Sequence, residues 1–221
     1  MIADAWKVAA KDLRSEWRTK ESLNAALAVT VVLLLLFSFA FDPGAEDSKL
    51  WSGGLLWLVY SFAAALIVNR GFARELPNDC LEALRASPIP PGALFLGKAF
   101  AGFVLLLAVE LAALPAFLVF YNVSLTWQAG WVAASFALAT WGIAVLGTMF
   151  GALTVNLQMR ELMLPVLIYP MMMPALVAAI EITGASIQRQ AIPEIWLRLL
   201  TGFDIIFTAL AVLLADVVLV D

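Results

Sequence analysis

The chain contains no histidine, and Cys80 is its single cysteine. A lone thiol forms neither an internal disulfide nor a cysteine metal cluster, and histidine is the commonest protein ligand of zinc and haem iron. We therefore do not expect metal or haem catalysis by this chain.

Several sequence motifs that bind nucleotides or carry out hydrolysis are also missing. The sequence contains no G-x-x-x-x-G-K-[ST] phosphate loop, no G-x-S-x-G and no H-E-x-x-H. The chain cannot bind ATP in the manner of a P-loop protein, so any ATP hydrolysis that it depends on must occur in another subunit.

Charged residues are scarce. They make up 14% of the chain, against 63% hydrophobic residues and a mean hydropathy of +0.95. Soluble domains contain about 45–50% apolar residues. The net charge of −4 is small and spread over loops on both sides of the membrane, so it does not indicate nucleic-acid binding, and we discard that class of partner.

Long apolar runs occupy most of the chain and predict an all-α membrane protein of one domain, residues 1–221. Each run approaches the ~20 residues that cross a bilayer core about 30 Å thick. A charged segment, in place of the short basic region of a signal peptide, precedes the first run, so we expect the first span to stay in the membrane. The six predicted spans cover about residues 25–41, 50–68, 99–121, 129–153, 162–182 and 203–220.

Residues 1–23 predict an amphipathic helix that lies in the membrane interface. Its apolar residues recur at steps of three or four, with most charges on the opposite face. Trp6 and Trp17 would lie at the level of the lipid headgroups. The alternative is a helix packed against a soluble partner. The apolar residues in question are Ile2, Trp6, Ala9, Leu13 and Trp17.

A polar segment, residues 69–98, separates the second and third predicted spans. Its charge predicts exposure to water, including that of Lys98 at its end. Residues 81–85 have helix-forming composition, with Asn78 and Asp79 as candidate caps before them and Ser87-Pro88 as a stop after them. A short helix between two spans is a surface that a soluble partner could bind. The alternative is an ordinary solvated connector.

Lys and Arg are unevenly distributed between the two sets of connecting segments. If the N-terminus is cytoplasmic, ten of the 13 lie in residues 1–23, 69–98 and 154–161, and three lie in the opposite segments. Because cytoplasmic segments of membrane proteins carry the excess of Lys and Arg, this distribution predicts that both termini and residues 69–98 face the cytoplasm.

The loop before the sixth predicted span contains a second candidate helix. Pro193 in a first turn, followed by Ile195, Trp196, Leu199 and Leu200, favours a short helix over residues 191–200 that dips into the outer leaflet.

Glu110 is the one carboxylate predicted in the middle of a span. Ionised groups at membrane depth are costly and normally face a cavity or a partner, so Glu110 is a candidate for the transport pathway. The alternative is a protonated Glu that is hydrogen-bonded between helices. Asp204 and Asp216 are predicted near the two ends of the sixth span, where water is close.

The fifth predicted span contains three prolines, Pro165, Pro170 and Pro174, around Tyr169 and Met171–Met173. Prolines remove backbone donors and bend a helix, and membrane helices tolerate them where protein or a cavity satisfies the freed carbonyls. A bent, methionine-lined helix would suit a bulky apolar molecule, with Tyr169, Pro170 and Pro174 on its pathway. The alternative is that methionine only fills space. In the fourth span, Gly142, Gly147 and Gly151 predict close helix packing.

The order of these features resembles the type-2 permeases of ABC exporters and, within them, the CcmB family, the haem exporter permease of cytochrome c maturation. Span layout agrees over almost the whole chain. The specific motifs are the Pro170–Pro174 pattern and the cytoplasmic stretches Phe72–Leu76, Leu81–Leu84, Ser87–Pro90 and Gly97–Lys98. Asn78-Asp79 departs from the acidic residue and glycine usual at that place, and Pro77 is unusual there.

This resemblance implies a multi-pass protein of the bacterial inner membrane that pairs with a separate ABC ATPase subunit. It also implies that ATP hydrolysis drives either haem export or release of a haem-loaded periplasmic chaperone. The implied partners are haem-handling membrane subunits and that chaperone, with two permease copies per complex. Segment 69–98 would then couple the ATPase to the spans, with Leu81 and Leu84 as anchors, Glu75, Glu82 and Arg85 setting the register, and Pro88 in the exit.

Three other functions remain open at this point. A type-2 permease could export a lipid, a drug or a polysaccharide, and a membrane scaffold would need no nucleotide-dependent partner. An intramembrane enzyme would have to use Glu110, because the sequence offers no other candidate base or nucleophile.

Overall fold

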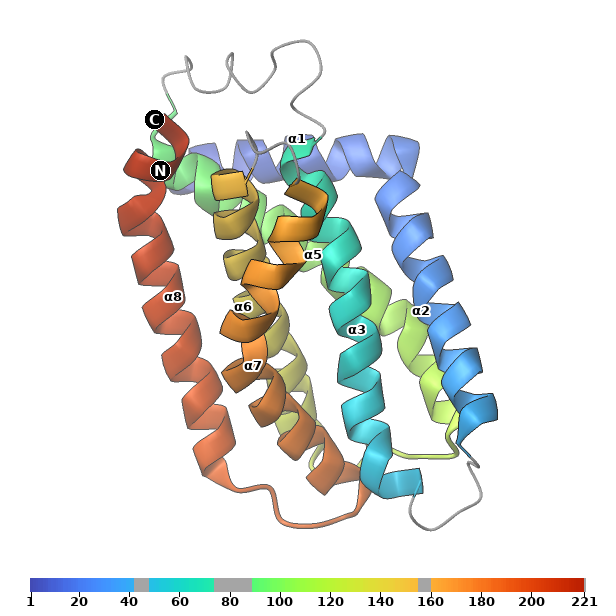
Figure 1. Cartoon of the computed structure of the whole chain (residues 1–221). Coiled ribbons are helices and arrows are strands. Elements are labelled where there is room, and N and C mark those ends of the chain that lie inside the picture. The colour runs from blue at the N-terminus through green and yellow to red at the C-terminus, as the bar shows by residue number, and fades with distance from the viewer. Residues whose placement is uncertain (42–47, 74–88, 155–159, 221) are drawn as a thin grey trace.

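The computed structural model describes residues 1–41, 48–73, 89–154 and 160–220, which form helices and no strand. Six of these helices are long and apolar enough to cross a membrane, which confirms the predicted all-α, six-span fold. The helices, labelled in Figure 1, are α1 (Ile2–Thr19), α2 (Glu21–Ala40), α3 (Ser48–Ala73), α5 (Pro91–Phe120), α6 (Ala129–Thr154), α7 (Arg160–Ile187) and α8 (Glu194–Val220).

Helix α1 lies across one end of the bundle, and the six long helices run between that end and the other (Figure 1). A sharp corner at Lys20, whose φ of 53° is left-handed, turns the chain from α1 into α2. The Glu16 carboxylate, buried at this corner, accepts hydrogen bonds from the backbone N–H groups of Ser22 and Leu23 at 2.9 and 3.0 Å. Glu16 thereby caps α2 and holds the corner.

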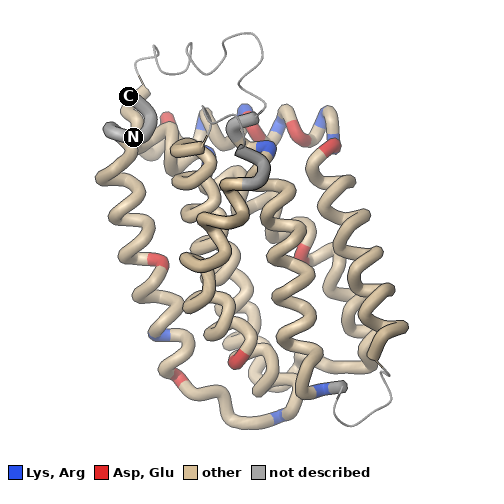
Figure 2. The backbone as a smooth tube through the Cα atoms, viewed as in Figure 1, with Lys and Arg blue, Asp and Glu red and all other residues tan. Residues whose placement is uncertain are grey.

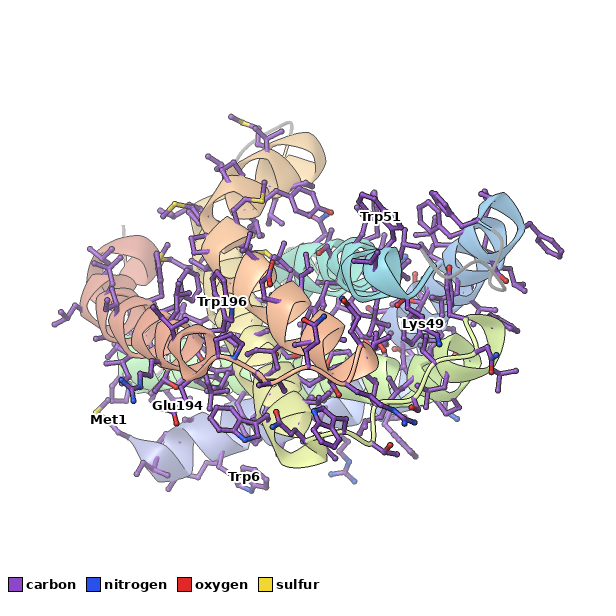
Figure 3. The ribbon with its side chains drawn as sticks, turned by 90° about the horizontal axis from the view of Figure 1, so that it is seen from below. Met1, Trp6, Lys49, Trp51, Glu194 and Trp196 are labelled. Atoms are coloured by element: carbon purple, nitrogen blue, oxygen red, sulfur yellow. The ribbon has the colours of Figure 1, made fainter. Side chains whose placement is uncertain are left out.

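The amphipathic helix predicted over residues 1–23 is present as α1, but the face that packs on the bundle differs from the predicted apolar face. Val8, Ala9 and Glu16 are buried, whereas Trp6 and Trp17 are 61% and 76% exposed. Trp6, labelled in Figure 3, has its ring centroid 5.9 Å from that of Phe100 on α5. The tryptophans therefore lie beside the packed face, where they are free to contact lipid, and the interfacial position of α1 stays a prediction.

The third span begins earlier than predicted. Helix α5 starts at Pro91, not near residue 99, because Pro90 occupies the N-cap and a proline is well tolerated at the first helical position. The prediction that Lys98 lies in water is wrong, since Lys98 is only 5% exposed within α5. Its charge is compensated by an ion pair, described below, that the sequence pattern did not reveal.

The separate short helix predicted over residues 191–200 is also wrong. Helix α7 continues to Ile187, and α8 runs without interruption from Glu194 to Val220, so residues 194–200 are its first turns. An ion pair between Arg198 and Glu194 at 2.7 Å spans the first turn. The sixth span therefore starts at Glu194 and includes residues that had been assigned to a loop.

Helix α6 lies at the centre of the bundle and contacts α3, α5, α7 and α8. Its glycines allow close packing, as predicted for Gly142 and Gly147. A Cβ atom at Gly147 would collide with Val68 of α3, and one at Gly142 would lie 2.8 Å from the Asp204 carboxylate of α8. Figure 2 shows that charged residues concentrate along α1 and are few and scattered along the long helices.

Candidate functional site

The residues proposed to couple an ATPase lie outside the described residues. These are Glu75, Leu81, Glu82, Leu84, Arg85 and Pro88, all within residues 74–88. The two helices that flank this segment are described: α3 ends at Ala73 and α5 begins at Pro91. Both of these helix ends lie at the end of the bundle that α1 crosses (Figure 1).

The outgoing flank, the end of α3, is paired with the start of α2. Arg70 lies 2.6 Å from a carboxylate oxygen of Glu21, with side chains 37% and 69% exposed. A pair this exposed contributes at most about 1 kcal/mol to stability. The ion pair instead positions the end of α3, because it joins α3 to the α1–α2 corner.

The returning flank is held by Lys98, on the second turn of α5. The Lys98 ammonium lies 3.3 Å from a carboxylate oxygen of Asp12 on α1 and 3.4 Å from the backbone carbonyl of Gly71 on α3. Gly97 lies beneath α1, where a Cβ atom would come 2.5 Å from the Ala5 carbonyl oxygen. These contacts join α1, α3 and α5 immediately beside segment 74–88.

Glu110 lies in the interior between α3, α5 and α6. It is 3% exposed, and its two carboxylate oxygens lie 2.7 and 2.8 Å from the Thr140 hydroxyl of α6. The Tyr60 hydroxyl of α3 donates to the Glu110 backbone carbonyl at 3.0 Å. This geometry supplies the hydrogen-bonded environment that the structural alternative requires, and a transport role for Glu110 stays a prediction.

An aromatic cluster next to Glu110 was not found from the sequence. Trp57 is fully buried, with its ring 5.0 Å from Phe136 and 6.0 Å from Tyr60. Its indole N–H donates to the Thr183 hydroxyl of α7 at 3.0 Å. The sequence pattern predicts neither the complete burial of Trp57 nor its hydrogen bond to Thr183. Burial of an aromatic ring with its polar atom satisfied makes this cluster a rigid part of the core.

The cavity that Tyr169 of α7 borders is not lined by Glu110 among the described residues. The Tyr169 hydroxyl donates to the Ser61 carbonyl of α3 at 3.4 Å and borders a cavity of about 10 Å³. Pro170 and Pro174 are exposed on the outside of the bundle, together with Met171. That cavity is too small for a bulky molecule, so a pathway along these residues would need a second chain to enclose it.

The methionines of α7 differ in their surroundings. Met172 is 1% exposed and fills space in the core, as the plainer interpretation proposes, while Met173 is 60% exposed. Among the described residues, no three of histidine, cysteine, aspartate and glutamate gather as a metal site would require.

Asp204 is placed differently from the prediction. Because α8 begins at Glu194, Asp204 lies ~15 Å along the helix, well inside the span and away from its end. It is 6% exposed, and within the described residues neither carboxylate oxygen has a hydrogen-bond partner. Recognising that the helix predicted over residues 191–200 continues without a break into the sixth span would have revealed this depth. The side chain of Asp216 lies outside the described residues.

Comparison with known proteins identifies the family of this chain. The sequence profile of the family described as CcmB protein matches residues 3–218. The chain belongs to the CcmB family. The match extends from the first turn of α1 almost to the end of α8 and includes residues 74–88. The family predicted from the sequence is therefore confirmed.

Three relatives of this chain carry the name Heme exporter protein B. The protein of Rhodobacter capsulatus is 30% identical over 200 residues, covering 90% of this chain and 91% of the relative. The protein of Pseudomonas aeruginosa is 27% identical over 92% of each chain. The protein of Paracoccus denitrificans is 28% identical over 173 residues, covering 77% of this chain and 78% of the relative.

Proposed function

We propose that this chain is the permease subunit of an ABC transporter complex for cytochrome c maturation. It couples ATP hydrolysis by a separate subunit to haem export or to release of a haem-loaded periplasmic chaperone. The observation that carries this proposal is membership of the CcmB family over residues 3–218, with relatives named Heme exporter protein B.

The division of labour between subunits is supported by what the chain contains. Six helices are long enough to span a membrane, and the sequence has no phosphate loop for ATP. The chain itself is therefore a membrane subunit and not an enzyme, and an ABC ATPase is its energy-converting partner.

The end crossed by α1 faces the cytoplasm of a bacterium, with the spans in the inner membrane. The outward face of α1 carries a row of basic residues, Lys7, Lys11, Arg14 and Arg18, which line one surface depression. Asp4 precedes this row, and a hydrogen bond that it accepts from Lys7 at 3.0 Å lowers the pKa of the Asp4 carboxyl group. The overall excess of Lys and Arg at this end supports the same orientation.

Segment 74–88 receives the movement of the ATPase. Leu81 and Leu84 anchor it in the partner, while Glu75, Glu82 and Arg85 set its register and Pro88 ends it. The movement then reaches the start of α2 through the pair Arg70–Glu21 and reaches α1 through the pair Lys98–Asp12. Displacing α3 and α5 together in this way would rearrange the loop between α7 and α8 at the opposite end of the bundle.

The substrate pathway includes Glu110, Tyr169, Pro170 and Pro174. Because Pro170 and Pro174 are exposed on the outside of the bundle, the pathway forms between this chain and a neighbour. Two permease copies per complex would supply that neighbour, and haem-handling membrane subunits and a periplasmic chaperone would receive the haem. The chain has no histidine to bind haem iron, which fits transient contact with haem.

The decisive experiment uses Leu81→Asp and Leu84→Asp variants purified from the native membrane. A charge on the anchoring face should abolish co-purification of the ATPase and cytochrome c maturation, while the permease stays in the membrane. Ala191→Asp, an exposed position in the connection at the other end of the bundle, is the matched control. An intact complex with normal activity in both Leu variants would refute the coupling role.

A further inference from the structure

An open groove of about 770 Å³ runs along α8, where α8 meets α5 and α6. Helix α8 contributes most of its lining, α6 contributes Leu138 and Trp141, and α5 contributes Leu96. Neither Glu110 nor Tyr169 lines this groove. It is therefore a surface separate from the residues of the proposed substrate pathway.

The carboxylate of Asp204 lines the groove and has no partner within the described residues. Its side chain is 6% exposed, and neither oxygen accepts a hydrogen bond there. Gly142 of α6 leaves space for the carboxylate, since a Cβ atom at Gly142 would lie 2.8 Å from one of its oxygens. Ionisable residues inside membrane spans normally pair with another group, because a carboxylate buried without a donor is costly. Asp204 therefore calls for a donor from outside the described part of the chain.

Two donors close to Asp204 in the fold or along the chain already have acceptors. The indole N–H of Trp141, in the groove wall, donates to the Thr208 hydroxyl at 3.0 Å. Arg198, the nearest cation along α8, pairs with Glu194 at 2.7 Å. Neither group is therefore left to satisfy the Asp204 carboxylate.

The lining of α8 has the pattern of a helix-packing face. Its residues recur at steps of three or four, and the small residues Thr201 and Ala209 are exposed. Small residues allow the backbones of two membrane helices to approach closely. From Thr201 to Leu213 the face is ~18 Å long, which accommodates about three turns of a second helix. The lining residues of α8 are Thr201, Asp204, Ile205, Thr208, Ala209, Val212 and Leu213.

Neither a lipid nor a second copy of this chain supplies the missing donor. Asp204 lies ~15 Å along α8, at a depth filled by acyl chains, which have no hydrogen-bond donor. A second copy in the same orientation places its span cations nearer to the helix ends than Asp204, the eleventh residue of α8. Within eight residues of a helix end lie Lys49, Arg70, Lys98, Arg160 and Arg198.

We propose that this groove binds a transmembrane helix of a different subunit, which places a Lys or Arg side chain against Asp204. The inference rests on the proposed function, since that function calls for further membrane subunits beside the permease. A charge-assisted hydrogen bond to Asp204 fixes the depth and register of the partner helix. Leu96, Leu138 and Val212 pack against its apolar side chains.

Photocrosslinking in the complex assembled in its native membrane identifies the occupant. The crosslinker p-benzoylphenylalanine is incorporated in place of Ile205, 65% exposed in the groove, or in place of Ile206, 63% exposed outside it. We expect position 205 to yield an adduct with a membrane helix of another subunit, mapped by mass spectrometry, that carries Lys or Arg in its middle. Position 206 is the matched control and should yield at least about tenfold less of that adduct.

The other possible adducts at position 205 contradict the proposal. Adducts with lipid alone, with a second copy of this chain, or with a helix that lacks Lys and Arg would each overturn it. So would equal yields of the same adduct from positions 205 and 206.

Charge removal tests the ion pair itself. Asp204→Leu should lower co-purification of the crosslinked subunit at least about tenfold, because the cation of the partner is left buried and unpaired. Asp204→Asn keeps the size of the side chain and should also lower it. Glu181→Leu, which removes an exposed carboxylate outside the groove, is the control. Normal co-purification of Asp204→Asn would overturn a cationic partner.

A double variant separates the ion pair from a general structural role of Asp204. Replacing the mapped Lys or Arg of the partner by Leu should disrupt the pair as strongly as Asp204→Leu. Combining the two substitutions leaves no unpaired charge and should restore co-purification. Losses that add in the double variant would overturn the ion pair.

The failure of this inference is distinguishable from failure of the proposed function, because crosslinking requires no transport assay. A complex that retains an ATPase and matures cytochrome c but gives no such adduct would overturn the groove alone. A chain that gives the adduct but assembles with no ATPase would overturn the proposed function alone.

Discussion

The Thr140 hydroxyl of α6 lies 2.7 and 2.8 Å from the two carboxylate oxygens of Glu110 on α5. This bridge joins two helices in the interior of the membrane-spanning bundle, and Tyr60 of α3 binds the backbone at the same residue. A single acidic residue thus holds three helices together. The unusual position of Glu110 has a packing function, whatever part it plays in transport.

Glu110→Gln separates packing from transport. The amide can still hydrogen-bond Thr140, so we expect an unchanged thermal midpoint in detergent. As a pathway residue, Glu110 needs its carboxyl group, and cytochrome c maturation should fall at least about tenfold. Glu110→Leu should lower the free energy of unfolding by about 1–3 kcal/mol, since Thr140 loses its partner. Normal maturation by Glu110→Gln would leave only the packing role.

Gly97→Ala should loosen α1 from α5. The added Cβ would come 2.5 Å from the Ala5 carbonyl oxygen and 2.7 Å from the Val8 Cβ, so the helices must move apart. Overpacking of this kind costs about 1–3 kcal/mol. We expect a lower thermal midpoint and faster proteolysis of α1. Gly102→Ala, on the same helix, should show neither effect, because the nearest atom to its added Cβ is the Ala144 Cβ at an ordinary contact distance of 3.9 Å.

Trp57→Phe should destabilise the bundle. The substitution removes the N–H that donates to Thr183, and because both side chains are fully buried, the hydroxyl is left unpaired. The free energy of unfolding should fall by about 1–3 kcal/mol. Thermal unfolding in detergent measures this change. Trp51→Phe on the same helix α3, 66% exposed, should be neutral, and an equal loss at both positions would contradict the assignment.

The single cysteine offers a direct test of orientation. Cys80 lies within residues 74–88, which we propose face the cytoplasm. A membrane-impermeant maleimide should therefore label Cys80 only after the inner membrane is opened. In a Cys80→Ser background, Lys49→Cys on the opposite end should react in intact spheroplasts. Labelling of Cys80 from outside would reverse the orientation and remove the ATPase from segment 74–88.

The amino-acid sequence by itself determined the class of fold. A bilayer core requires about 20 consecutive apolar residues per helix, and no other spanning structure satisfies the backbone of such runs. Composition therefore identified six helical spans, and the stretches around Leu81–Leu84 and Pro170–Pro174 led to the CcmB family. Both conclusions depend on local patterns, which sequence displays directly.

Only the tertiary structure decided where polar groups lie. Lys98 was assigned to water and Asp204 to a span end, because a charge at the edge of an apolar run is normally solvated. In the fold, Asp12 compensates Lys98 across 86 positions of sequence, and Gly142 makes room for Asp204. The pairing of Glu110 with Thr140 and of Trp57 with Thr183 has the same origin. Whether a polar residue can be buried depends on a partner from another helix, and helix packing alone supplies that partner.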